Sequence, residues 1–158
     1  MDYEERLHRL GLKLSPVPTP LGNYLPAVRV NNLLILSGVL PIRGNTLAYT
    51  GRVGEEITIE QGYEAARTAT INALSIIKNE LGSLNNVERV LRLVGYVSSG
   101  EHFTQQSRVV DGASDLLVDV FGENGKHARV AVGVAWLPGN SPVELELVVS
   151  IKETKKES

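Results

Sequence analysis

Arg129 stands out among the polar residues because of the side chains that share its face of a predicted strand. The positions at two-residue spacing after it are Ala131 and Gly133, so an arginine is followed by very small residues. A guanidinium offers a planar fork of donors that binds a carboxylate through two hydrogen bonds. Small neighbours leave room for such a ligand, and the pattern therefore predicts a carboxylate pocket. The alternative is a structural salt bridge with Glu144, Glu146 or an acidic residue elsewhere.

Glu144 is the second residue whose type suits chemistry. A carboxylate within hydrogen-bond reach of a water can act as its general base; the alternative is a solvent-facing strand residue. If the two last strands are neighbours around the turn from Leu137 to Pro142, Arg129 and Glu144 lie about 20 Å apart along the sheet. We therefore expect them to act on one ligand only if the site forms between subunits or a strand bends.

Tyr24, Ser37 and Gly38 are further candidates for contacts with a ligand. Tyr24 lies in a proline-rich segment, where its ring could cover a pocket and its hydroxyl could donate to a ligand. Ser37 and Gly38 end an apolar strand and could offer a hydroxyl and a backbone N–H to a carboxylate. The alternatives are a packing anchor for Tyr24 and a strand-terminating turn for the Ser-Gly pair.

Composition excludes several other kinds of site. The 158 residues carry a formal net charge of −2 and no cysteine, so disulfides and thiolate metal sites are excluded and no nucleic-acid partner is expected. His8, His102 and His127 lie far apart in sequence, and we expect no metal. The chain holds no Gly-rich phosphate cradle and no GxSxG nucleophile motif. Without a signal-like N-terminus or a run of about 20 apolar residues, no membrane association and a cytoplasmic location are expected.

Strands that alternate with two long helices predict one domain over 1–158, with helices packed on a single sheet. Thr58 and Gln61 form a capping-box pattern that opens a helix ending near Gly82. Other expected elements are a short amphipathic helix over 3–13, a proline-rich lead-in to about 20, a hairpin over 27–38, short strands near 46–54, a strand over 87–99, a helix over 111–122, strands over 127–137 and 143–149, and a solvated tail over 153–158.

The face opposite Arg129 is apolar, with four large side chains at alternating positions: Val130, Val132, Val134 and Trp136. If helices cover only one side of the sheet, these side chains need another partner. We therefore expect an oligomer; the alternative is a monomer whose second sheet face is wet.

Two stretches carry a resemblance to a known family. The first is LLILSGVLP, and the second is HARVAVGVAWLPGNSPVELELVV near the C-terminus. Both resemble signature motifs of the RidA/YjgF family, often labelled endoribonuclease L-PSP, and the likeness covers about residues 20–152. The run VVDGASDLLVDVFGENGKHAR resembles a longer-chain subgroup of that family.

The resemblance implies a chorismate-mutase-like α+β fold, with a mixed sheet, two main helices on one face and a short N-terminal helix. It also implies a homotrimer with ligand sites between subunits. The implied activity is hydrolysis of reactive 2-imino or 2-enamino acids, of the 2-iminobutanoate and 2-iminopropanoate type, to 2-keto acids and ammonia, without a cofactor. The partners implied are other copies of the chain and a small carboxylate ligand.

Residue roles follow from the same resemblance. Arg129 matches the arginine that holds the substrate carboxylate, and Glu144 matches the glutamate beside the attacking water. Tyr24 matches a tyrosine after the N-terminal turn, while Ser37 and Gly38 match the family's Ser-Gly pair.

The sequence also departs from the family pattern. Ala131 replaces a frequent cysteine that contributes mainly backbone contacts, Val39 replaces a glutamine, and Ser114 replaces a ligand-binding asparagine of the helix. Several extra residues between Phe103 and Phe121 remodel the segment over the site. Two other functions stay open: a small-carboxylate-binding or regulatory protein without turnover, and an RNA-cleaving translation inhibitor.

Overall fold

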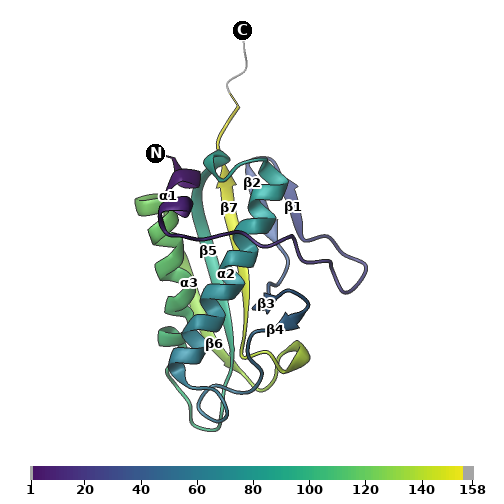
Figure 1. The fold of residues 1–158 in the computed structure, drawn as a ribbon, viewed down its shortest axis with the longest axis vertical. Coiled ribbons are helices and arrows are strands. Elements are labelled where there is room, and N and C mark those ends of the chain that lie inside the picture. Colours follow the sequence, from purple (N-terminus) through teal and green to yellow (C-terminus); the bar gives the residue numbers. More distant parts are fainter. Residues whose placement is uncertain (1, 155–158) are drawn as a thin grey trace.

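The computed structural model describes residues 2–154, in which two long helices cover one face of a five-stranded sheet (Figure 1). The expected tail falls partly outside the described residues. The helices are α1 (Tyr3–Arg9), α2 (Ile59–Leu81) and α3 (Gln106–Phe121). The sheet has the order β1-β2-β7-β5-β6, from β1 (Ala27–Val30), β2 (Leu33–Leu36), β7 (Val143–Ile151), β5 (Val87–Ser98) and β6 (Ala128–Val134).

Shorter elements connect these layers. A small hairpin pairs β3 (Ile42–Arg43) with β4 (Thr46–Leu47), and single 3-10 turns occupy η1 (Leu84–Asn86), η2 (Gly122–Gly125) and η3 (Pro138–Asn140). No helix of the described chain is long and apolar enough to cross a membrane.

The strands β6 and β7, on either side of the Pro/Gly turn, are not neighbours in the sheet. The interpretation that they form one pair is therefore wrong. β5 lies between them, parallel to β6 and antiparallel to β7. The remaining pairs, β1 with β2 and β2 with β7, are antiparallel. The connection after β6 therefore crosses the end of β5 through η3 before β7 begins, as a mixed sheet requires.

The α2 helix forms where its end signals predict. Thr58 accepts from the Gln61 backbone and the Gln61 side chain accepts from the Thr58 backbone, a complete capping box. At the other end, Gly82 adopts the left-handed conformation that favours glycine.

The boundaries of two other helices differ from the prediction. The α3 helix begins at Gln106 rather than 111, because Val109 and Val110 are fully buried and extend its apolar face. The α1 helix ends at Arg9 rather than 13, since Gly11 takes a positive φ of 69°. The second predicted short strand is reduced to isolated bridges made by Val53.

The core fills the space between the helices and the sheet. The opposite face of the sheet leaves apolar side chains exposed: Val28, Val30, Ile35, Val130, Val132 and Trp136. The helices thus cover one face only, and the predicted α+β architecture with a short N-terminal helix is confirmed.

Candidate functional site

Arg129 lies on the edge strand β6 and faces α3. Its Nη1 donates to Oδ1 of Asp111 at 2.8 Å and to Oγ of Ser114 at 3.1 Å. Nη2 makes a longer contact of 3.4 Å with the Ser107 carbonyl oxygen. Because Asp111 and Ser114 are three residues apart, they lie on one face of the helix and meet the same guanidinium. The sequence-predicted residues Arg129 and Ser114 are thereby brought together.

Ser114 continues this network to His127. Its Oγ lies 2.9 Å from Nε2 of the imidazole, whose Nδ1 lies 2.6 Å from the Gly125 carbonyl oxygen. A carbonyl only accepts, so Nδ1 donates, and in the tautomer whose single hydrogen is on Nδ1 the Nε2 atom accepts the Ser114 hydroxyl hydrogen. The serine can then accept from Arg129 with a lone pair. The orientation of the guanidinium is therefore supported from two elements, α3 and the start of β6.

The small residues beside Arg129 let α3 approach the sheet. A side chain on the neighbouring Gly95 of β5 would collide with Val110 of α3. At Gly133, an added Cβ would lie 2.8 Å from Nε2 of Gln106, which fills this space. The small-residue face is thus partly covered by the helix: Arg129 and Ala131 are partly buried, while Gly133 is exposed.

Glu144 belongs to a second group of candidates, on the β2 side of β7. Backbone bonds between Val39 and Leu145, 2.8 and 3.0 Å long, bring the segment after β2 alongside β7. An added Cβ on Gly38 would lie only 2.8 Å from Oε1 of Glu144, so a side chain here would displace the carboxylate. Burial and the nearby Glu146 carboxylate raise the pKa of Glu144 above its ordinary value. A carboxyl group with a raised pKa is a stronger base, which suits proton abstraction from water.

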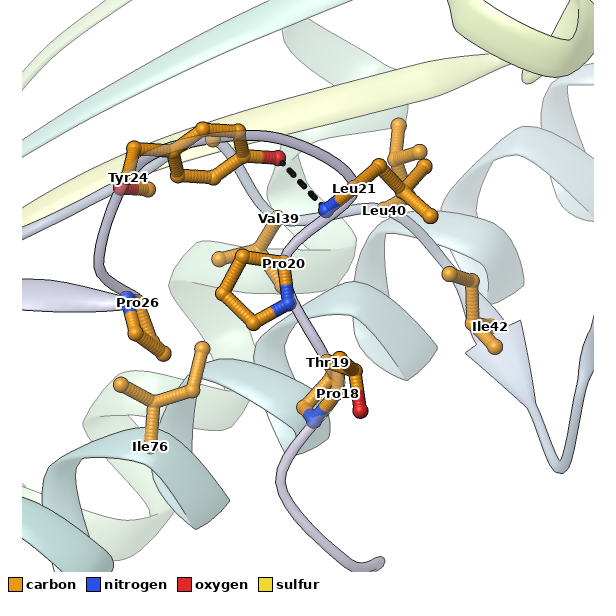
Figure 2. Close-up of a pocket in the computed structure, with 12 residues that line it drawn as sticks. Pro18, Thr19, Pro20, Leu21, Tyr24, Pro26, Val39, Leu40, Ile42 and Ile76 are labelled. Atoms are coloured by element: carbon orange, nitrogen blue, oxygen red, sulfur yellow. Dashed lines mark hydrogen bonds between the residues drawn. The ribbon is translucent and has the colours of Figure 1, made fainter.

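Ser37 and Tyr24 complete this second group. The Ser37 hydroxyl donates to the Leu25 carbonyl oxygen at 2.5 Å, which leaves its lone pairs available to a ligand. Tyr24 lines a cavity of about 70 Å³ between the proline-rich segment, residues 37–42 and Ile76 of α2 (Figure 2). Its hydroxyl accepts from the Leu21 N–H at 3.4 Å, so the hydroxyl hydrogen remains free to donate. Tyr24 and Gly38 are thus lining residues of one pocket.

The two groups do not meet within one chain. Arg129 pairs in register with Leu93 of β5, whereas Glu144 pairs with Tyr96. Two strand spacings and three residues along the sheet give roughly 14 Å between the Cα atoms. The two side chains also point to opposite faces, because Leu93 is buried beneath the helices and Tyr96 belongs to the open face with Glu146. This separation of roughly 14 Å across two strand spacings replaces the offset of about 20 Å expected if β6 and β7 were neighbours.

Two residues of this region were missed in the sequence. Asp111 is the ion-pair partner of Arg129, and its helical spacing from Ser114 was the available signal. Asn72 lies on the buried side of α2 and donates from Nδ2 to the carbonyl oxygens of Leu40 and Ile42, at 3.0 and 2.9 Å. It thereby holds the wall of the Tyr24 pocket. An asparagine among the apolar positions of a helix was its signal.

Comparisons with known proteins agree with this architecture. The family described as "YjgF/chorismate_mutase-like, putative endoribonuclease" matches residues 4–151. Protein TCP17 from Trypanosoma cruzi is 42% identical over 146 residues, which cover 92% of this chain and 91% of the relative. A crystal structure of a protein with unknown function from Agrobacterium tumefaciens has a TM-score of 0.89 at 40% identity, covering 95% of this chain and 92% of that one.

A more distant relative has a named activity. The 2-iminobutanoate/2-iminopropanoate deaminase from Dermatophagoides farinae is 28% identical over 137 residues, which cover 85% of this chain and 91% of the relative. The family match spans nearly the whole chain, and the resemblance seen in the two sequence motifs is confirmed: the chain belongs to the YjgF/chorismate-mutase-like family.

Proposed function

We propose that the protein hydrolyses reactive 2-imino and 2-enamino acids to 2-keto acids and ammonia, at sites between neighbouring subunits of a homotrimer. One observation carries this proposal. Arg129 lies at the β6 edge, and Glu144 lies beside Gly38 on the β2 side of β7, about 14 Å away and on the other face. A cyclic assembly joins one edge of each subunit to a different edge of the next, which would bring the two groups to a shared ligand.

The chemistry of the two groups suits this reaction. Arg129 would bind the substrate carboxylate, while Glu144 would take a proton from water as it attacks the electrophilic carbon of the protonated imine. The resulting tetrahedral intermediate carries an amino and a hydroxyl group. Glu144 returns its proton to the amino nitrogen, the carbon–nitrogen bond breaks, and the departing ammonia takes up the hydroxyl proton as the 2-keto acid forms. Orientation and general-base assistance are sufficient because the iminium carbon is already electrophilic. We expect the reaction to proceed without a cofactor or metal. We also infer that residues 1–158 form one domain and that the protein is located in the cytoplasm.

The pocket residues have supporting roles in this scheme. Tyr24 can donate its hydroxyl hydrogen to the ligand, and Ser37 can accept through its lone pairs. Ala131 offers backbone contacts next to Arg129, and Ser114 holds the guanidinium in place. The assembly would also cover the exposed apolar face of the sheet.

The test follows the loss of 2-iminobutanoate generated in situ by a dehydratase. We expect the wild-type chain to accelerate this loss and Arg129→Ala to reduce the acceleration by about a hundredfold. Arg129→Lys keeps the positive charge but lacks the planar pair of donors, and it should recover only part of the rate lost in Arg129→Ala. Arg108→Ala is the matched control, since Arg108 is an exposed arginine of α3 that contacts Gln105. Equal rates with and without the wild-type chain would refute the proposal.

A second function, binding of small carboxylates without turnover, is favoured by one observation. Within one chain Arg129 lies roughly 14 Å from Glu144, so a carboxylate bound at Arg129 has no Glu144 general base beside it. In that function Arg129→Ala abolishes binding of 2-oxobutanoate, whereas wild-type chain leaves the imine lifetime unchanged. The same two measurements therefore separate the enzyme from the binding protein.

A further inference from the structure

Arg129, the candidate carboxylate-binding residue, already lies beside an acidic side chain, that of Asp111. Arg129 and Asp111 form an ion pair of 2.8 Å, and their side chains are 23% and 46% exposed. Neither group is sealed in the core, so both remain within reach of a ligand at this end of β6. The pair is therefore part of the surface that a ligand would meet, in addition to any structural role.

The hydrogen-bond pattern leaves donors and acceptors free on both partners. Nη1 of Arg129 uses its two hydrogens on Asp111 and Ser114, and Nη2 makes only the long contact with Ser107. Within residues 2–154, no hydrogen bond engages Nε of Arg129 or Oδ2 of Asp111. The Nε and Nη2 atoms form a second donor fork, which can take a carboxylate while Asp111 stays in place.

Asp111 changes which ligands this fork favours. A ligand with a carboxylate alone gains from Arg129 but is repelled by Asp111 a few ångströms further away. A ligand that also carries a cationic nitrogen gains from both charges. For unit charges about 6 Å apart, Coulomb's law gives a preference of about tenfold when the effective dielectric constant is about 40, between the values for a protein surface and for bulk water.

We propose that Asp111 is a specificity-determining residue that makes the site select zwitterionic ligands over purely anionic ones. The inference rests on the proposed function, in which the zwitterion is the protonated 2-imino acid. Water adds to its iminium carbon and the carbon–nitrogen bond breaks, giving a 2-keto acid anion and an ammonium ion. The substrate therefore enters with a cationic nitrogen and the organic product leaves without one. Asp111 therefore strengthens binding of the protonated, electrophilic substrate and weakens binding of the 2-keto acid product.

The test measures binding with two unreactive ligands of similar size. By calorimetry, 2-aminobutanoate serves as the zwitterion and 2-oxobutanoate as the anion. We expect the wild-type chain to bind the zwitterion about tenfold more tightly, and Asp111→Asn to reduce this ratio to about one. Asparagine keeps the shape and can still accept from Arg129. Asp111→Glu retains the charge and should keep the preference.

Asp115→Asn is the matched control, because it removes the same charge one turn further along α3. Asp115 accepts from the Tyr63 hydroxyl at 2.7 Å and has no contact with Arg129 among the described residues. A ratio that is equal in wild type and Asp111→Asn, or that falls equally in Asp115→Asn, overturns the inference, as does the absence of binding of either ligand to wild type. Failure of the proposed function is a different result: the wild-type chain then leaves imine loss unaccelerated, whatever the binding ratio.

Discussion

Subunit complementation tests whether the two groups of site residues act across an interface. The perturbation combines two inactive chains, Arg129→Ala and Glu144→Gln, in one assembly. Each variant lacks one group but retains the other. In a homotrimer with sites between subunits, a site regains both groups when Arg129 comes from a Glu144→Gln chain and Glu144 comes from an Arg129→Ala chain.

The size of the recovery follows from the geometry. Within one chain, the Cα atoms of Arg129 and Glu144 are roughly 14 Å apart and their side chains point to opposite faces of the sheet, so no chain can complete a site alone. Each mixed trimer then has one intact site of its three. Purification over both tags keeps only the mixed trimers, so about one third of all sites are intact and we expect about one third of the wild-type rate.

The assay uses chains with two different affinity tags, mixed by co-expression and purified over both tags. Imine loss is followed for the mixed assembly and for each variant alone. The control is a mixture of Arg129→Ala with a chain that carries both Arg129→Ala and Glu144→Gln, in which no site can recover both groups. A mixed assembly of Arg129→Ala and Glu144→Gln that is no faster than its components would refute an inter-subunit site, provided wild type is active.

Further substitutions test single contacts. Gly38→Ala places a Cβ 2.8 Å from the Glu144 carboxylate and should lower kcat by about tenfold, measured as imine loss, with little change in melting temperature. The raised pKa of Glu144 means that the ionised carboxylate destabilises the fold as pH rises through that pKa, so Glu144→Gln should melt higher than wild type at pH 7 and equally below the ordinary value of 4.5. Gly112→Ala forces a Cβ against the Tyr63 carbonyl where α2 and α3 cross, and denaturant titration should show a loss of about 3 kcal/mol. Asn72→Leu leaves two pocket carbonyls without their donor and should cost about 2 kcal/mol by the same method; an unchanged midpoint would contradict this role.

Local patterns predicted the elements whose signals lie within a few residues. The capping box at Thr58 and the left-handed Gly82 both depend on neighbouring backbone groups, and both appear where the sequence indicates. The hairpin over 27–36 likewise has its turn at Asn31, with a φ of 51°. The sequence pattern predicts too late a start for α3, because only the packed core shows that Val109 and Val110 are buried on it.

The sequence by itself determined the element types and the α+β class. It also determined which side chains share a face of each of the last two strands, and which residues could bind a carboxylate. Only the tertiary structure decided that β5 lies between β6 and β7, that Asp111 meets Arg129, and that Glu144 lies beside Gly38. The physical reason is range. Side-chain periodicity and caps are local properties, whereas strand order and ion-pair partners depend on contacts between residues far apart in the chain.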